Sequence, residues 1–345
     1  MKIKVNLKEN SYEVLIDESF DFSTYKNITV LSNEKLFSLY EKELKKIIKT
    51  DFSHILIPDG EGEKNINRVE KVLDELFELR LDRKSLLISF GGGVLSDLTG
   101  FIASIYMRGI DFINMPTSLL ACVDAAVGGK TGINNKYGKN LIGSFYQPKA
   151  VLIHTDFLKS LDERELLSAV SEIIKMAVFF DEDLFLKLEK SEIKDAKSFV
   201  LENAELLISR SVKMKARVVE LDEKESSLRM SLNYGHTFAH VIEQESGYGH
   251  YLHGEAVAFG MVMANNLACN IGLLNKDLAL RVKALLEKFN FKTSYKINDA
   301  KSFYDAFFLD KKSKKGKLNF VLLKGLKEFV IKDDISEDEI MEILR

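Results

Sequence analysis

Cysteine is scarce in this sequence, since only Cys122 and Cys269 occur among its 345 residues. Both stand in apolar surroundings, and their spacing does not match that of a metal site built from cysteines. Buried thiols in a reducing compartment are therefore a better interpretation than a disulfide. We expect reduced cysteines and a cytoplasmic protein.

Long apolar runs and a signal peptide are missing as well. No apolar run reaches the roughly 18 residues that a membrane-spanning helix needs. The first residues, Met1–Val5, alternate polar and apolar side chains, whereas a signal peptide would continue into an apolar stretch. The sequence thus predicts a cytoplasmic location and no membrane partner.

Neither sign of charge dominates. Lys and Arg number 49 and Asp and Glu 52, which gives a formal net charge of −3. This near balance argues against nucleic acid or an anionic membrane as the main partner. We therefore expect a small-molecule partner, and any anion site must be local.

The length of the chain and its 46% hydrophobic residues suit two domains. Period-two alternation at 3–7 and 12–16 predicts an N-terminal β-hairpin. Apolar runs that alternate with helical patterns then predict a parallel sheet, with strands at 28–32, 54–58, 85–90, 111–115 and 150–154 and helices at 34–49 and 64–79. Helical patterns continue to residue 308, and a small strand is expected at 318–323. We expect an α/β domain with a Rossmann-like parallel sheet at 1–155 and a mainly α-helical domain at 156–345.

A triple glycine, Gly91–Gly93, stands between an expected strand and a helical pattern. Glycine allows positive φ and close approach of a ligand, and the helix start behind it offers N–H groups to a phosphate. A tight turn without a ligand is an equally good interpretation, because the spacing is not that of G-x-G-x-x-G. Ligands of open parallel sheets bind beyond the carboxyl ends of the strands, where the loops 32–33, 59–64 and 116–118 also fall. Together these loops could enclose a dinucleotide.

Residues 124–143 break the regular pattern with two glycine turns that each carry a lysine. A connection of this length inside a domain is usually functional or disordered. Lysines on glycine turns indicate anion binding, and the alternative is a solvated, charged loop.

Four of the six histidines fall between His236 and His253. His236 and His240 share a helix face and could bind a metal that His253 completes, although such pairs are common in helices without a metal. Glu172 and Lys175 point the same way from a largely apolar helix. Such a charge pair often faces a cleft, but a surface salt bridge is the default interpretation.

Several motifs, in a fixed order, resemble the dehydroquinate synthases, the shikimate-pathway members of the sugar phosphate cyclase family. The resemblance covers almost the whole chain and rests on the segments 59–61, 91–94 with 97, 106–109, 124 with 127–132, 139–143, 232–237 and 310–312. It implies an enzyme of aromatic amino-acid biosynthesis that uses NAD and a divalent metal, zinc or cobalt. Its reaction would convert 3-deoxy-D-arabino-heptulosonate 7-phosphate into 3-dehydroquinate and phosphate. The family also suggests a homodimer.

The family's site residues carry over to this sequence by motif. The resemblance implies that the metal ligands are Glu172, His236 and His253. This corrects the spacing argument, which pairs His236 with His240. Catalytic proton transfer would fall to His240, Glu225 and Lys175. NAD would contact Glu61, Lys64, Gly92, Gly93, Val94, Asp97, Thr117, Ser118 and Lys139. Substrate, with its phosphate and carboxylate, would contact a group rich in cations: Arg108, Asp124, Lys130, Asn140, Lys175, Lys215, Arg229, Asn233 and Lys312. The carboxylate would be received by Lys130 and Arg229, two cations expected to be buried.

The implied reaction is neutral in redox terms. NAD would take a hydride from the substrate, phosphate would be eliminated, and the hydride would return before an intramolecular aldol closure. The rivals are another sugar phosphate cyclase, a metal-dependent polyol dehydrogenase that releases NADH, and a non-catalytic nucleotide-binding protein. Ser96, Ser227 and Asp162 depart from the family's pattern without touching the implied chemistry, and Asp162 is expected to cap a helix.

Overall fold

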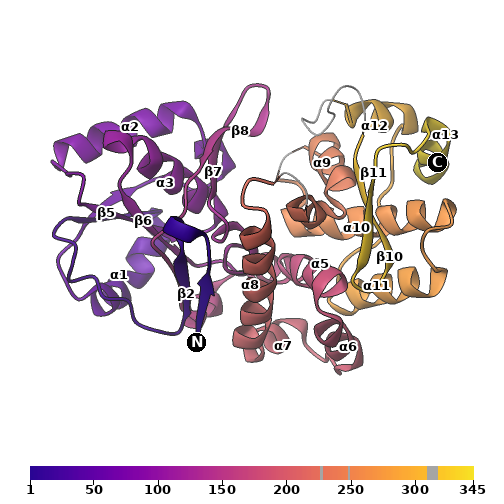
Figure 1. The fold of residues 1–345 in the computed structure, drawn as a ribbon, viewed down its shortest axis with the longest axis horizontal. Coiled ribbons are helices and arrows are strands. Elements are labelled where there is room, and N and C mark those ends of the chain that lie inside the picture. The colour runs from indigo at the N-terminus through magenta and orange to yellow at the C-terminus, as the bar shows by residue number, and fades with distance from the viewer. Residues whose placement is uncertain (226–227, 248, 309–317) are drawn as a thin grey trace. The chain divides into compact units, whose positions relative to one another are not determined.

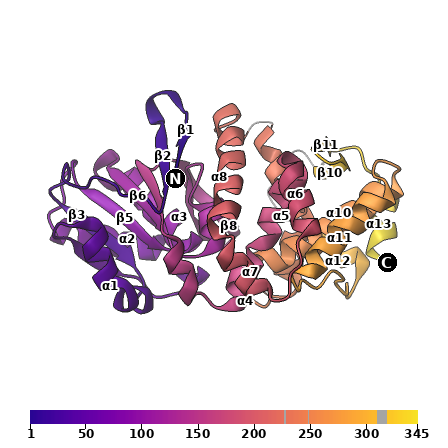
Figure 2. The ribbon, with the colours of Figure 1, turned by 90° about the horizontal axis from the view of Figure 1, so that it is seen from below.

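The computed structural model describes residues 1–225, 228–247, 249–308 and 318–345. They divide into two compact units, Met1–Leu161 with Ala204–Lys224, and Asp162–Asn203 with Glu225–Arg345 (Figures 1 and 2). Helix α8 (Ala204–Leu221) thus groups with the first unit although it follows helices of the second. The assignment of NAD binding to residues 1–155 and of metal and substrate binding to residues 156–345 stays a prediction. None of the described helices is long and apolar enough to cross a membrane.

A mostly parallel sheet forms the first unit. Its described strands lie in the order β1, β2, β9, β6, β5, β3, β4, and of these pairs β1 and β2 alone are antiparallel. The bounds are β1 (Lys2–Val5), β2 (Tyr12–Ile16), β3 (Ile28–Ser32), β4 (Ser53–Leu56), β5 (Leu86–Gly91), β6 (Asp111–Pro116) and β9 (Ala150–Ile153). The predicted hairpin and the Rossmann-like parallel sheet are confirmed.

The two faces of the sheet carry different helices because neighbouring residues of a strand point to opposite sides. In β5, Ile88 and Phe90 join the cluster of α1 (Glu34–Ile48), whereas Leu87 joins that of α2 (Ile66–Glu78) and α3 (Gly93–Ile105). Asn33 begins α1 by accepting a hydrogen bond from the Leu36 N–H at 2.8 Å. The neighbours of β3 are β4 on one side and β5 on the other, so the carboxyl ends of β3 and β5 mark the switch point at which such sheets bind ligands.

The stretch 124–143, expected as an irregular loop, contains most of a β-hairpin. Strands β7 (Lys130–Asn135) and β8 (Gly138–Phe145) pair antiparallel, and Gly132 lies opposite Gly143. A Cβ on Gly143 would lie 2.2 Å from the Thr131 carbonyl oxygen, so this close pairing needs glycine. The glycines and lysines that make the pairing possible also hide the alternation by which a strand is predicted. A single π-helical turn, Ala121–Ala125, precedes the hairpin and packs against α8.

The second unit is mainly helical, as predicted. Helix α10 (His253–Asn270) lies at its centre and packs against α5, α9, α11 and strand β10 (Figure 2). The other described helices are α4 (Glu163–Ser168), α5 (Val170–Phe180), α6 (Glu182–Lys190), α7 (Ala196–Glu202), α9 (His236–Glu245), α11 (Lys276–Lys288), α12 (Ala300–Ala306) and α13 (Glu337–Leu344). The expected late strand is present as β10 (Phe320–Gly325), and its partner β11 (Glu328–Lys332) was not predicted.

Candidate active site

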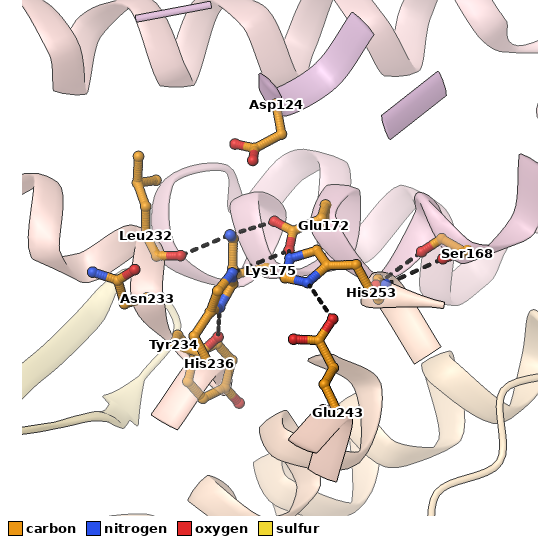
Figure 3. A network of polar contacts seen from close by, with 12 residues as sticks. Asp124, Ser168, Glu172, Lys175, Leu232, Asn233, Tyr234, His236, Glu243 and His253 are labelled. Atoms are coloured by element: carbon orange, nitrogen blue, oxygen red, sulfur yellow. Dashed lines mark hydrogen bonds and ion pairs between the residues drawn. The ribbon is translucent and has the colours of Figure 1, made fainter. Parts of the chain in front are cut away.

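Three ligand-type side chains meet in the second unit. Glu172 comes from α5, and His236 and His253 are the first residues of α9 and α10. The Nε2 atoms of His236 and His253 lie 3.5 and 3.6 Å from Glu172 Oε1 (Figure 3). One ligand atom from each residue lies within 4.8 Å of the other two, so the three side chains can hold one metal ion.

The surroundings of Glu172 test whether a metal fits this cluster. Its side chain is 0% exposed, and its Oε1 atom, which faces the two imidazoles, has no hydrogen-bond partner. Lys175, itself 2% exposed, forms an ion pair with it, so the pair predicted as a surface salt bridge or a cleft pair is buried. A buried carboxylate oxygen that accepts no hydrogen bond is unfavourable, and a cation shared with two imidazoles removes the cost. One carboxylate and two imidazoles with an open position are the donor set of a catalytic divalent metal, and the residues present fit such an ion.

Outer contacts orient both imidazoles toward Glu172. The Nδ1 atom of His253 lies 3.5 Å from Glu243 Oε1, and Nδ1 of His236 lies 3.1 Å from the Tyr234 carbonyl oxygen (Figure 3). Burial disfavours the charged ring of His253, but the hydrogen bond and negative charge of Glu243, together with the charge of Glu172, raise its pKa overall. A metal held by His253 would take the place of a ring proton, because a metal binds the neutral imidazole.

Close packing brings the two histidines to the cluster. Gly254, next to His253, sits against α4, where an added Cβ would lie 1.7 Å from the Ser168 carbonyl oxygen. Gly235, next to His236, has φ +78° and touches the backbone of Gly260 in α10. Each of the two histidine ligands therefore stands next to a glycine that a larger residue cannot replace without moving the helix start.

Sequence reasoning missed Glu243. It lies seven residues after His236 on α9, a spacing that places both on one helix face. A buried acidic residue two helical turns from a predicted ligand is the signal by which it could have been found.

Replacing Glu243 by glutamine is expected to weaken metal binding about tenfold, and alanine should weaken it up to about a hundredfold, as for other outer partners of metal-bound histidines. Glutamine can still accept a hydrogen bond from Nδ1–H but has no charge, which is why its effect is smaller. Competition with a chromogenic chelator measures the affinity. Glu245→Gln, an exposed position on the same helix, is the matched control, and equal affinities for Glu243→Ala and the control would show that this contact does not support the site.

The predicted cofactor loops lie together at the carboxyl edge of the first unit's sheet. Lys64 is buried and forms an ion pair with Asp97, and burial raises the pKa of Asp97 although Lys64 opposes the change. The Thr117 N–H donates to the Gly91 carbonyl at 3.0 Å, which joins the triple glycine to the loop after β6. None of the three glycines takes the positive φ that glycine allows. Space is limited at two of them, because a Cβ on Gly91 would lie 3.3 Å from the Leu95 Cβ and one on Gly93 would lie 3.2 Å from the Ala125 Cβ.

The predicted substrate residues of the first unit lie on five elements: α8, the π-helical turn, the 3-10 turn Tyr106–Arg108, β7 and β8. Lys215 of α8 donates to Asp124 Oδ1 at 2.6 Å and also to its carbonyl oxygen, so these two are paired with each other. Arg108 is exposed, with φ +73°. Lys130 begins β7 and Asn140 lies in β8; both are exposed, and the expectation that Lys130 is buried is wrong.

In the second unit, Arg229 is 1% exposed, and Lys175 donates to the Leu232 carbonyl at 2.7 Å. Asn233 donates to Glu225 Oε1 at 3.1 Å, and the rings of His240 and His236 lie 5.8 Å apart. Lys312 and Ser227 lie outside the described residues. The structure thus places Lys175 beside Glu172, His240 beside His236 and Glu225 beside Asn233, while their roles in proton transfer stay predictions.

The other two departures fit their surroundings. Asp162 accepts a hydrogen bond from the Arg164 N–H at 2.9 Å, so the predicted cap is confirmed. Ser96 is buried in α3, where its hydroxyl lies 3.3 Å from the Gly92 carbonyl oxygen. Of the cysteines, which are both free, Cys122 is buried as predicted and Cys269 is partly exposed.

Two family models match consecutive parts of the sequence. One, described as 3-dehydroquinate synthase N-terminal, spans residues 54–168, and the other, described as 3-dehydroquinate synthase C-terminal, spans residues 169–313. The chain belongs to the 3-dehydroquinate synthase family. A 3-dehydroquinate synthase from Campylobacter jejuni subsp. doylei is 55% identical over 348 residues, an alignment that covers 100% of this chain and 99% of the relative.

Solved structures of sugar phosphate cyclases share the fold. The 2-epi-5-epi-valiolone synthase of Streptomyces hygroscopicus, with NAD⁺ and Zn²⁺ bound, is 26% identical, with a TM-score of 0.86 and coverage of 98% of this chain and 97% of its own. A 2-deoxy-scyllo-inosose synthase complexed with carbaglucose-6-phosphate, NAD⁺ and Co²⁺ is 20% identical, with a TM-score of 0.86 and coverage of 100% and 99%. The chain's sequence identity to full-length 3-dehydroquinate synthases is higher than its identity to these two solved structures. This identity and the two family models confirm the predicted family, enzyme class and 3-dehydroquinate synthase function.

Proposed function

We propose that this chain converts 3-deoxy-D-arabino-heptulosonate 7-phosphate into 3-dehydroquinate and phosphate with NAD and one divalent metal, zinc or cobalt, as cofactors. The observation that carries the proposal is the cluster of Glu172, His236 and His253, in which both imidazole Nε2 atoms face a buried carboxylate oxygen, Oε1 of Glu172, that accepts no hydrogen bond. The chain's membership of the 3-dehydroquinate synthase family supports the same reaction. When bound, the metal would polarise a substrate alcohol and NAD would take up and return its hydride.

The chain's own residues bind and orient the substrate in this proposal. Arg229, buried and carrying a rigid fork of donors, receives the carboxylate together with Lys130. Lys175 is held in place by the Leu232 carbonyl and Glu172. His240 is the residue we assign to proton transfer beside His236, with Glu225 as a second.

The cofactor loops of the first unit complete the assignment. NAD is held at the switch point of the sheet by the triple-glycine turn and its neighbours, which include Glu61, Lys64, Asp97, Thr117, Ser118 and Lys139. The predicted homodimer, which comes from the family resemblance alone, and the cytoplasmic location, which comes from the cysteines and the apolar pattern of the sequence, belong to the same proposal.

Turnover of phosphate without net reduction of NAD tests the reaction. Each NAD supports many cycles because its hydride returns to the substrate, so we expect inorganic phosphate to exceed the NAD present at least tenfold while absorbance from NADH stays flat. The measurement incubates the metal-loaded protein with the heptulosonate phosphate and a small amount of NAD, and follows phosphate and absorbance together. NADH that accumulates in step with product would support a polyol dehydrogenase in place of this proposal.

A further inference from the structure

Asn134 joins two segments to which different ligands are assigned. Its Nδ2 donates to Glu61 Oε1 at 2.7 Å, and its Oδ1 accepts from the Asn140 N–H at 2.8 Å. Its own N–H donates to the Lys64 carbonyl oxygen at 2.8 Å. One partly buried side chain therefore holds the 59–64 loop with its donor and the β8 strand with its acceptor.

The position of Asn134 in the hairpin explains why its side chain is free to do this. The register of β7 with β8 shifts between Ile133 and Asn135, exactly where Asn134 stands. A residue at such an irregularity is not paired in the ladder, and its side chain is re-aimed relative to those of the regular strand. β7 also packs against α2 and α3, which follow the cofactor loops, and this brings it within reach of Glu61.

The loop before α2 shows what Asn134 adds. Asn65 donates to the Gly62 carbonyl at 2.6 Å, and Glu63 accepts a hydrogen bond from Arg68 Nε at 2.6 Å, so these bonds remain within the loop and its helix. The hydrogen bond to Glu61 comes from a different element, more than seventy residues later in the chain. A carboxylate has two oxygens, so Oε1 can accept from Asn134 while Oε2 accepts from a cofactor hydroxyl.

On the other side, Asn140 has φ +54°, a left-handed conformation that is unfavourable for most residues. The Asn134 Oδ1 atom accepts its N–H, in place of a backbone carbonyl of the opposite strand. This bond stabilises the bend that presents Lys139 and Asn140, the residues assigned to cofactor and substrate.

We propose that Asn134 is a positioning residue that fixes Glu61 for the cofactor through its amide nitrogen and Asn140 for the substrate through its amide oxygen. The inference rests on the proposed function, since the roles of Glu61 and Asn140 belong to it. Asn134 touches neither ligand and acts through these two residues.

Two substitutions separate the two bonds. Asn134→Asp keeps an oxygen for the Asn140 N–H but replaces the donor to Glu61 by a like charge, whereas Asn134→Ala removes both groups. We expect Asn134→Asp to raise the Kd for NAD⁺ about threefold to tenfold and to leave the KM for the heptulosonate phosphate unchanged at saturating NAD⁺. Asn134→Ala should raise both constants. Calorimetry with NAD⁺ alone and steady-state kinetics of the metal-loaded full chain give the two readouts.

Two controls make the result decisive. Asn135→Ala, an exposed neighbour whose side chain accepts only a hydrogen bond within the turn, at 2.8 Å from the Tyr137 N–H, should leave both constants unchanged. Glu61→Ala should weaken NAD⁺ binding and abolish the further effect of Asn134→Asp. If Glu61→Ala binds NAD⁺ normally, the proposed cofactor role of Glu61 is wrong and the inference with it. If Glu61→Ala weakens NAD⁺ binding while the Asn134 variants bind NAD⁺ normally, the proposed function stands and the positioning role of Asn134 is wrong. The same conclusion follows if Asn134→Asp and Asn134→Ala change the Kd for NAD⁺ and the KM for the heptulosonate phosphate equally.

Discussion

Replacing His253 by alanine, or Glu172 by glutamine, is expected to empty the metal site and to lower kcat by about three powers of ten or more. Each change removes one of three ligand atoms that lie within 4.8 Å of one another. A metal that polarises a substrate oxygen supplies several kcal/mol of stabilisation, and each power of ten in rate corresponds to ~1.4 kcal/mol. The loss of affinity should also exceed the roughly 10–100-fold effect of an outer partner such as Glu243.

Elemental analysis of the purified variants after dialysis against a weak chelator measures the first effect, and phosphate release measures the second. His250→Ala is the matched control, because it removes an exposed imidazole three residues before the ligand. It should retain about one metal per chain and full activity. Metal retained in both ligand variants would show that Glu172, His236 and His253 are not the ligands. Unfolding curves for all three proteins check that the Lys175 ammonium, which loses its charged partner in Glu172→Gln, does not unfold the chain.

The parallel sheet was predictable because its strands are short apolar runs separated by helical patterns, and this periodicity follows from burial on both faces. The β7–β8 hairpin was not, because Gly132 and Gly143 occupy paired positions where an alternating pattern would show apolar side chains. The grouping of α8 with the first unit has no local signal either. It depends on packing against β1 and the π-helical turn, elements far away in the sequence.

The candidate site was only partly readable from spacing. Helical periodicity favoured His236 with His240, whereas the cluster in the structure joins His236 to His253 and Glu172 from two other helices. Their approach depends on contacts such as that of Gly254 with Ser168, which no periodicity reports. The family resemblance supplied the right set because it carries tertiary information that one sequence does not contain.

In the proposed reaction, substrate choice depends on Arg229, a residue that is 1% exposed. The heptulosonate carries a carboxylate as well as a phosphate, whereas glucose 6-phosphate, the parent of the carbaglucose-6-phosphate in the 2-deoxy-scyllo-inosose synthase complex, has the phosphate alone. A guanidinium offers a carboxylate two parallel N–H bonds, and in a site with little water these bonds are strong. Only Arg229 of the proposed carboxylate pair is buried, since Lys130 is exposed, so we expect the arginine to account for most of the discrimination.

We therefore expect the unmutated enzyme to act on the heptulosonate phosphate and to have almost no activity on glucose 6-phosphate. Arg229→Leu should lower kcat/KM for the heptulosonate by about two to four powers of ten, because breaking a buried, hydrogen-bonded charge pair costs ~3–5 kcal/mol. Arg229→Lys keeps the charge but loses the fork of donors, so its kcat/KM for the heptulosonate should lie between that of the unmutated enzyme and that of Arg229→Leu. Steady-state assays of phosphate release with each sugar measure these values.

Arg281→Leu is the control for the loss of an arginine as such. Arg281 forms a two-bond ion pair with Glu189, at 2.7 and 2.8 Å, in the same unit but outside the proposed site. Its removal can lower stability, yet kcat/KM for the heptulosonate should stay within about twofold, because an exposed or half-exposed pair contributes little. An effect confined to the Arg229 variants separates carboxylate recognition from a general loss of folding. Unchanged kinetics in Arg229→Leu would mean that the carboxylate is received elsewhere, because a buried guanidinium that binds it cannot be removed without a large loss. Equal kcat/KM for both sugars in the unmutated enzyme would likewise contradict the role of Arg229 in choosing the substrate.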